Sequence, residues 1–410
     1  PADPPPDIVF RHLDANIGVQ DGKVTERNAF SGSGIDLLLS LLERKILENF
    51  AGLENAALTR VRHVECISSA CQSVEFARHR LGVAPELASE DLRNALINIE
   101  ELAYQMSRRR PGGNRLGTKR DEKDSIEILS GLFEGKTTGT PVAILIRNTN
   151  QRSDDYSPIS TFFRPGHADY TWQEKFGIRD WRGGGRSSGR ETAARLAAGA
   201  IAMQILLSKG ITVRAYTTQI GPLKAIKRDF TAINKNLASC PDMEVASQME
   251  SLIDDIREKN DSVGGIIECQ ITGVPVGLGE PVFQKTEALL SHAIMSIGAT
   301  KGIEFGEGFN CVNFKGSQHN DMMDRNGFLS NHAGGINGGI SNGDPIIFRV
   351  PIKPTASISL EQRTRDIHGN EQNIVVEGRH DPCICIRIVP VIEAMSALTI
   401  LSLWYDQNGR

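Results

Sequence analysis

The chain has 410 residues and a net charge of −4, with 40% hydrophobic and 23% charged residues. These values are typical of globular proteins and exclude fibrous and disordered classes, and the net acidity argues against general nucleic-acid or membrane-surface binding. The sequence contains no run of 18 apolar residues, so it predicts no membrane-spanning segment. The unusual number is 40 glycines, close to a tenth of the chain against an average of about 7%. This surplus predicts turns and loops in which the backbone closes on a ligand.

The first 96 residues differ from the rest. They open with a proline-rich stretch and then carry a helical apolar pattern over residues 35–50. A second helix is expected from Ser89, as its N-cap, through Met106, with acidic residues in its first turn and a basic run at its end. We therefore divide the chain into a partly helical N-terminal segment, residues 1–96, and a main domain, residues 97–410.

The main domain mixes strands and helices. Alternating apolar residues predict paired strands at residues 126–128 and 142–146, and a glycine-dense loop at 181–189 precedes a largely apolar helix at 191–209. Further strands are expected at residues 212–217, 265–271 and 345–352, and a last apolar helix at 391–405. Because strands and helices do not alternate regularly, we expect an α+β fold rather than a doubly wound sheet.

Arginine stands beside glycine or proline in four places: residues 108–115, 164–167, 182–188 and 378–381. Glycine lets backbone N–H groups approach an anion closely, and the guanidinium fork binds phosphate or carboxylate. The third cluster directly precedes a helix, whose N-terminus favours negative charge. A shared anionic-ligand site is therefore expected, although the glycine spacing matches neither a Rossmann fold nor a P-loop.

Two histidines in these clusters are candidates for proton transfer. His167 lies in a Pro/Gly turn, and His380 precedes Asp381 beside Arg379. The alternative for each is a hydrogen-bonded turn residue. No metal site is predicted, because His319 and His332 lack partners at ligand spacing. The seven cysteines are scattered without C-x-x-C spacing, which indicates reduced thiols in a cytosol-like compartment.

Longer motifs resemble those of the chorismate synthase family, in family order from about Ile97 to the C-terminus. They are RRRPG (108–112), ILSGLFEGKTTGTP (128–141), RPGHADYT (164–171), RGGGRSSGRETAAR (182–195), GVPVGLGEP (273–281), GSQHND (316–321), NHAGG (331–335), GGISNG (338–343), KPT (353–355) and GRHDP (378–382).

The resemblance implies antiparallel sheets around central helices, usually in a homotetramer. It implies a lyase that converts 5-enolpyruvylshikimate 3-phosphate into chorismate and phosphate by a 1,4-anti elimination. The family requires reduced FMN without net redox change, and NADPH serves some members as flavin reductant. The expected compartment is the cytoplasm, with a plastid as the alternative.

The resemblance also implies roles for individual residues. His167 resembles the histidine that protonates or polarises the reduced flavin, and Asp381 the aspartate that acts with flavin N5 to remove the substrate proton. Arg109 and Arg115 resemble substrate-binding arginines. The implied flavin contacts are Arg186, Ser187, Ser188, Gly298, Ala299, Gly338, Lys353, Pro354, Thr355, Ala356, Ser357 and Arg379. At Gly298 the family usually has Asn, and Ser188-Gly189 replaces its usual Ser-Ala.

One family motif is not found. Members begin with a strand and a Gly-Glu-Ser-His-Gly loop, whose histidine is thought to protonate the leaving phosphate. The expected position falls near residues 68–81, where His79 is the one nearby substitute. Three explanations stay open: an unrelated fusion, an altered reading of the gene, or loss of the second acid. The alternative function is therefore a catalytically impaired flavin- or phosphate-binding paralogue, and residues 1–96 could instead form a separate helical interaction module.

Overall fold

The computed structural model describes residues 97–118, 120–150, 160–182, 184–378 and 380–408, together with strands β1 (Gly18–Gln20) and β2 (Lys23–Thr25). The chain divides into two units, residues 1–85 and 86–410. In the first, β1 and β2 pair antiparallel. The helix expected at residues 35–50, and the residues His79 and Arg379, lie outside the described residues.

The second unit contains a five-stranded antiparallel sheet in the order β10–β15–β9–β7–β8. Its strands are β7 (Thr212–Ile220), β8 (Leu223–Lys224), β9 (Gly265–Thr272), β10 (Glu304–Phe305) and β15 (Ile346–Ile352). Cys269 at the centre of β9 pairs with Ala215 of β7 and Phe348 of β15, and all three are fully buried. Along β15 buried residues alternate with more exposed ones, so one face of the sheet forms core.

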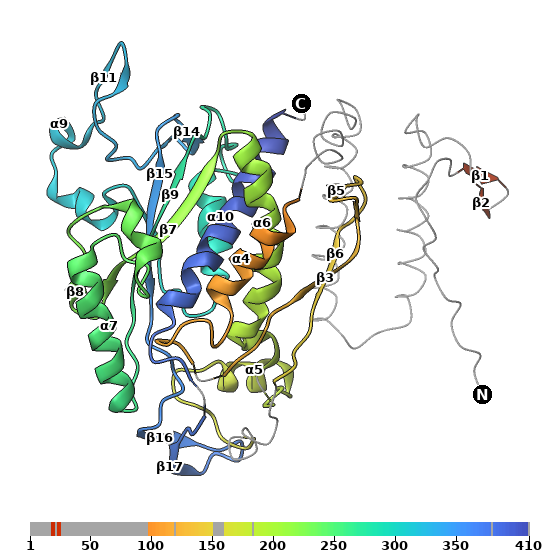
Figure 1. Cartoon of the computed structure of the whole chain (residues 1–410), viewed down its shortest axis with the longest axis vertical. Coiled ribbons are helices and arrows are strands. Elements are labelled where there is room, and N and C mark those ends of the chain that lie inside the picture. The colour runs from red at the N-terminus through yellow and green to blue at the C-terminus, as the bar shows by residue number, and fades with distance from the viewer. Residues whose placement is uncertain are drawn as a thin grey trace, which may run out of the picture. The chain divides into compact units, whose positions relative to one another are not determined.

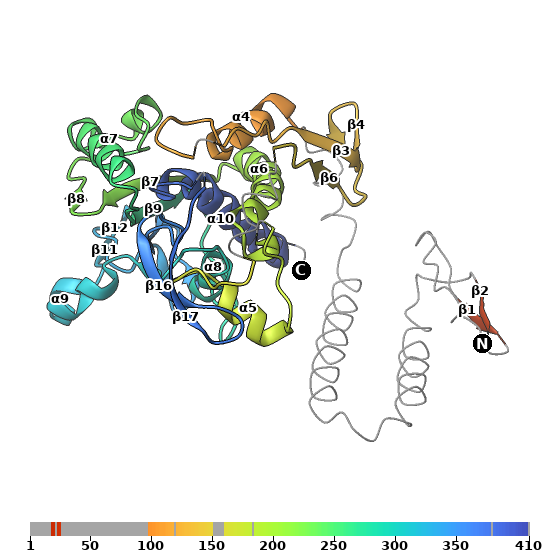
Figure 2. The ribbon, with the colours of Figure 1, turned by 90° about the horizontal axis from the view of Figure 1, so that it is seen from below.

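Helix α10 (Cys385–Asn408) lies at the centre of the unit (Figures 1 and 2). It packs against α4 (Ile99–Arg109), α6 (Thr192–Ser208), α8 (Thr286–Met295) and the strands β7 and β9. By length and composition α10 could cross a membrane, but 67% of its most apolar window is buried inside the protein, as in the core helix of a globular fold.

The remaining elements are shorter or peripheral. The helices are α5 (Asp169–Phe176), α7 (Met243–Glu258) and α9 (Gly316–His319). The 3-10 helices are η2 (Gly185–Ser187), η3 (Gly189–Glu191), η4 (Phe230–Lys235) and η5 (Gly308–Asn313). Antiparallel pairs are β3 (Ile126–Ser130) with β6 (Ala143–Ile146), β4 (Leu132–Phe133) with β5 (Lys136–Thr137), β11 (Met323–Asp324) with β12 (Gly327–Phe328), β13 (Ile336–Asn337) with β14 (Ile340–Ser341), and β16 (Glu361–Arg365) with β17 (Glu371–Val375).

A buried carboxylate joins three of the central elements. Glu393 of α10 is 3% exposed and accepts from the Arg108 guanidinium of α4, with its Oε2 2.5 Å from Nη1. Its Oε1 also accepts from the backbone N–H of Ala215 in β7. Because an unpaired buried charge is costly, this pairing fixes α4, α10 and β7 relative to one another.

The mixed helix and strand composition agrees with the α+β expectation. The predicted strand pair at residues 126–128 and 142–146 corresponds to β3 and β6, and the strands at 212, 265 and 346 begin within one residue of their expected positions. The expected start of the second helix was wrong. Ile97 and Asn98 are not helical, and Asn98 caps α4 by accepting from the N–H groups of Glu100 and Glu101. The last helix also begins earlier than expected, at Cys385, and continues through Pro390.

Gly199 allows α6 and α10 to approach closely. A Cβ built at this position would lie 2.3 Å from the Cβ of Ala394 and 2.4 Å from its Cα. Small buried residues on α6 continue this interface, including Ala193, Ala197 and Ala200. The two helices are therefore in backbone contact, which no larger residue at position 199 would permit.

Gly199→Ala should destabilise the protein by about 1–3 kcal/mol, because the new methyl group overpacks the contact with Ala394. At an ordinary position inside a helix, a change from glycine to alanine would instead raise the free energy of unfolding by about 1 kcal/mol. Urea unfolding measures the difference. The matched control is Gly316→Ala, whose Cβ would meet no atom within 4 Å, and it should leave stability almost unchanged. A Gly199→Ala protein as stable as the wild type would contradict the packing argument.

Candidate active site

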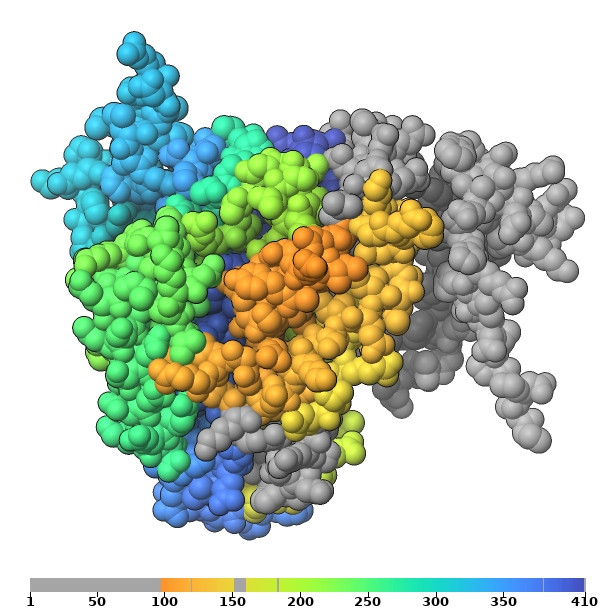
Figure 3. All heavy atoms as spheres, in the orientation of Figure 1, coloured from red at the N-terminus to blue at the C-terminus, as the bar shows by residue number. Residues whose placement is uncertain are grey.

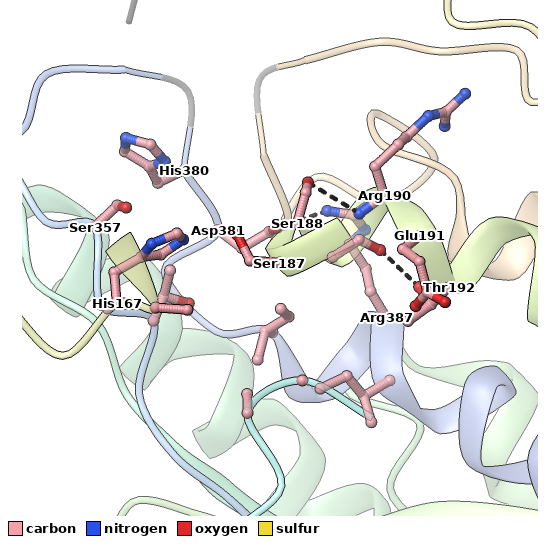
Figure 4. Close-up of a pocket in the computed structure, with 18 of the residues that line it drawn as sticks. His167, Ser187, Ser188, Arg190, Glu191, Thr192, Ser357, His380, Asp381 and Arg387 are labelled. Carbon is pink, nitrogen blue, oxygen red and sulfur yellow. Dashed lines mark hydrogen bonds and ion pairs between the residues drawn. The ribbon is translucent and has the colours of Figure 1, made fainter. Parts of the chain in front are cut away.

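A cavity of about 810 Å³ opens at the N-terminal ends of α6 and α10. Glu191 and Thr192 at the start of α6 line it, as do Ile384 and Arg387 around the first turn of α10 (Figure 4). Helix N-termini carry unpaired N–H groups and partial positive charge. Two of them beside one cavity favour an anionic ligand.

The charged side chains around the cavity reinforce this preference. Nine are arginine or lysine, and three are acidic: Glu191, Glu377 and Asp381. The cationic residues are Arg109, Arg120, Arg164, Arg186, Arg190, Arg195, Lys301, Lys353 and Arg387. A protein of net charge −4 thus concentrates positive charge here, as the arginine–glycine clusters predicted.

Some of these cationic side chains already form ion pairs and hydrogen bonds within the protein. Arg109 is 1% exposed, and its guanidinium donates to Asp124, Thr192 and the carbonyl of Gly189. Arg190 pairs with the other oxygen of Asp124. Burial and the nearby Arg387 guanidinium lower the pKa of Arg109 to about 9. Arg109 therefore braces the loop that begins α6, while its side chain reaches the cavity wall.

Other cations have no carboxylate partner. Among the described residues Arg186, Lys301 and Lys353 form no ion pair, and all three line the cavity. Lys353 donates to the carbonyl of Gly166 at 2.5 Å, which joins the run 353–357 to the loop that carries His167. These three side chains are the ones whose charge is available to a bound anion.

The loop before α6 is shaped by its serines. Ser187 Oγ donates to the Gly184 carbonyl at 2.6 Å, and Ser188 Oγ accepts from the backbone N–H of Arg190 at 3.2 Å. Gly184 and Gly185 have φ of +83° and +50°, which glycine adopts readily. The serine hydroxyls hold consecutive tight turns at the cavity edge (Figure 4).

Asp381 is held from two sides. Its Oδ2 pairs with Arg387 at 2.6 Å, and its Oδ1 accepts from the backbone N–H of Thr118 at 2.9 Å. Arg387 also donates to the Arg109 carbonyl, so α10 orients this carboxylate at the cavity wall. The adjacent His380 lines the same cavity, and burial together with the Arg164 guanidinium lowers its pKa, which favours the neutral imidazole.

His167 lines the cavity on the same side as His380 and Asp381, across from Glu191 and Thr192 (Figure 4). Its Nδ1 lies 2.9 Å from Oδ1 of Asp169, a buried residue at the start of α5. Burial opposes the negative charge of Asp169, but hydrogen bonds from Arg164 and His167 hold the pKa of its carboxyl well below the usual range. A neutral pH thus leaves a carboxylate behind the imidazole.

Comparison with known proteins agrees with this geometry. A sequence model of chorismate synthase matches residues 92–405, more than three quarters of the chain. The chain belongs to the chorismate synthase family. A crystal structure of a chorismate synthase is 29% identical with a TM-score of 0.60, and the match covers 77% of this chain and 85% of that one. The family consists of lyases that act on phosphates and generally use reduced flavin.

The structure gathers most residues that the chorismate synthase resemblance singled out. His167, Asp381 and Arg109 line the cavity together with Arg186, Ser187, Ser188, Gly298, Ala299 and the run 353–357. Arg115 does not line it. Its side chain is 57% exposed and pairs with Asp254 and Glu250 of α7. Gly338 lies at the turn between β13 and β14 and is also absent from the wall.

Sequence reasoning missed three supporting residues. Arg387 was overlooked because the last helix was expected to begin after Pro390, and an earlier start would have placed it in the first turn of that helix, six residues after Asp381. Thr118 acts through its backbone N–H, so its side chain gave no signal. Asp169 belongs to the RPGHADYT motif, and its position two residues after His167 was the available clue.

Glu122 fixes the cationic residue Arg120 at the cavity. Its buried carboxylate accepts from the Arg120 guanidinium and from Thr149 and Asn150. Although burial opposes the charge, these hydrogen bonds lower the pKa of Glu122 to about 2. A depressed pKa means that the carboxylate stabilises the fold above its unfolded pKa of about 4.5 and loses this contribution as the pH falls toward 2.

Glu122→Gln should therefore reduce the free energy of unfolding by about 1–3 kcal/mol at pH 7, because three donors lose a charged acceptor. The difference from wild type should stay constant down to about pH 4.5 and shrink below it. Urea unfolding at pH 7, 5, 4 and 3 measures this profile. Glu127→Gln is the control, because the Glu127 side chain is 42% exposed and pairs with Arg147 at the surface. A difference that grows on acidification would contradict the assignment.

Proposed function

We propose that this protein is a chorismate synthase that converts 5-enolpyruvylshikimate 3-phosphate into chorismate and phosphate by a 1,4-anti elimination. One observation supports this proposal most strongly. The two predicted acid/base residues, His167 and Asp381, line one cavity together with the cationic loops at the N-termini of α6 and α10. A substrate with one phosphate and two carboxylates suits such a wall, whose pre-arranged positive groups can stabilise negative charge.

The cavity also fits reduced FMN. Its volume lies within the range of about 300–1,000 Å³ typical of cofactor sites. Arg186 and Lys353 offer charge for the flavin phosphate, and Gly298 leaves room beside the wall because a Cβ there would meet no atom within 4 Å. When bound, the reduced flavin would supply electron density to the breaking C–O bond and recover it afterwards. NADPH is the proposed reductant.

The residues of the chain have complementary tasks in this proposal. His167 exchanges a proton at the ring nitrogen that faces the cavity, and Asp381 receives the proton removed from the substrate. The ion pair with Arg387 and the hydrogen bond from Thr118 orient the Asp381 carboxylate. The paired arginines of the wall are held in place by their carboxylates, so the charges are pre-arranged and little reorganisation accompanies reaction.

An anaerobic assay with photoreduced FMN tests the reaction directly. We expect chorismate absorbance and free phosphate in equal amounts. His167→Ala and Asp381→Ala should each lower turnover by about 10²-fold or more, as expected for lost acid/base groups. His368→Ala serves as a control, since His368 is an exposed residue of the β16–β17 turn. Full activity in both site variants would refute the assigned roles.

The alternative function makes a different prediction in the same assay. A catalytically impaired paralogue would bind FMN and the substrate without releasing phosphate, which equilibrium dialysis would reveal. Failure to bind FMN would overturn both functions.

Two further parts of the proposal concern location and fold. The proposed compartment is the cytoplasm. The proposed complete fold has antiparallel sheets on both sides of the central helices, as in the family.

We also propose self-association, as a homotetramer, through the arm formed by residues 308–329. This arm, which contains η5, α9, β11 and β12, projects from the rest of its unit (Figures 1 and 3). It carries large apolar side chains that are at least 61% exposed: Phe309, Val312, Met322, Met323 and Leu329. Exposed apolar groups of this density favour burial against another protein surface.

Phe309→Asp with Met323→Asp should dissociate the assembly, because each substitution places a charge in the buried contact. Light scattering coupled to size-exclusion chromatography gives the mass of each species. The control pair, Ile226→Asp with Ile178→Asp, alters apolar residues exposed by 85% and 77% on other segments and should leave the mass unchanged. An arm variant with the wild-type oligomeric mass would exclude the arm as the interface.

A further inference from the structure

We propose that Asp169 is the positioning residue that fixes the tautomer and orientation of His167, so that the ring exchanges protons through Nε2 only. The inference rests on the proposed function for the use of that proton, but the tautomer itself is a property of the protein without ligand. It starts from a buried charge cluster around Asp169, behind the wall from which His167 reaches the cavity.

Asp169 is the centre of this cluster. It is 4% exposed, and Arg164 donates to both of its oxygens, from Nε to Oδ2 at 2.7 Å and from Nη2 to Oδ1 at 2.9 Å. Nη1 of Arg179 lies 3.2 Å from Oδ1. The side chains of both arginines are 5% exposed. A carboxylate held by two buried guanidinium groups has little freedom to move.

His167 Nδ1 lies within hydrogen-bond distance of one hydrogen-bond acceptor and one donor. Asp169 Oδ1, an acceptor, is 2.9 Å away, and Arg164 Nη2, a donor, is 3.0 Å away. The Arg164 guanidinium already donates hydrogen bonds to both carboxylate oxygens of Asp169. A bare Nδ1 would hold its lone pair against a charged oxygen at 2.9 Å, whereas an Nδ1–H group donates to it. The carboxylate therefore places the proton on Nδ1.

The consequence lies at the other ring nitrogen. Among the described residues no protein group forms a hydrogen bond with Nε2, and His167 lines the cavity. In the neutral ring Nε2 carries the lone pair, and in the charged ring it carries the second proton. Asp169 thus has a role like that of the carboxylate behind the histidine in a catalytic triad, which orients the imidazole without taking its proton.

Solid-state ¹⁵N and ¹³C NMR of protein labelled at histidine reads the tautomer directly. The difference between wild type and His167→Gln identifies the His167 signals among the nine histidines. We expect Nδ1 protonated and Nε2 unprotonated in the neutral ring. A wild-type spectrum with Nε2 protonated and Nδ1 bare would overturn the proposal, and this measurement needs neither turnover nor a variant of Asp169.

Asp169→Asn tests the cause. The amide can donate to Nδ1, so the Nε2–H form should appear, and kcat should fall on the order of 10- to 100-fold with little change in KM. Asp169→Glu restores a carboxylate and should recover the Nδ1–H signal. Glu174→Gln is the matched control, an exposed carboxylate on the same helix, and should behave as wild type.

The outcomes separate this inference from the proposed function. A folded Asp169→Asn protein, judged by thermal unfolding, with unchanged tautomer and kcat would refute the positioning role. If that variant does not fold, the wild-type and Asp169→Glu spectra still decide. An Nδ1–H tautomer in a protein without lyase activity would support the positioning and reject the function instead.

Discussion

The close contact between α6 and α10 is the constraint on which the site depends. Gly199 has no side chain and meets the small Ala394, so the helices lie side by side through the middle of their unit (Figure 2). Both N-termini then open into one cavity, although they come from segments almost 200 residues apart in the chain. Their partial positive charges add, and the site is anion-binding before any side chain is considered. The arginines strengthen a preference that the backbone already sets.

Concentrating nine cations around one cavity creates repulsion that the fold must offset. Five carboxylates around the cavity do so, and four of them are buried or nearly buried. Asp124 pairs with Arg109 and Arg190, and Asp381 pairs with Arg387. The other three pairs are Glu122 with Arg120, Asp169 with Arg164, and the partly exposed Glu191 with Arg195. The cations therefore fall into two groups. The paired ones are rigid parts of the wall, while Arg186, Lys301 and Lys353 have no carboxylate partner among the described residues and can meet a ligand's charge.

Local patterns predicted the regular elements well and their ends less well. The buried faces of β7, β9 and β15 and the apolar α6 follow directly from hydrophobic periodicity. The predicted start of α4 was wrong. Ser89 is a plausible N-cap in the sequence, but in the structure Asn98 makes the capping hydrogen bonds. The start of α10 was missed because a proline usually ends a helix, whereas Pro390 lies inside this one.

For the site, the motifs identified residues on loops but not the residues that pair with them. The pairs Asp124–Arg190 and Thr118–Asp381 join residues 66 and 263 positions apart, which no local spacing encodes.

The glycines show which departures from the family pattern the fold tolerates. Some motif glycines are enforced by packing: a Cβ at Gly273 or Gly279 would lie 2.1 or 2.3 Å from a backbone carbonyl oxygen. At Gly189 and Gly298, where this chain departs from the usual family residues, a Cβ would meet nothing within 4 Å, and both glycines line the cavity. A side chain there would meet no protein atom, so its absence leaves no packing defect. We therefore expect variation at these two positions to act through the ligand, while the glycines that hold backbone against backbone preserve the fold.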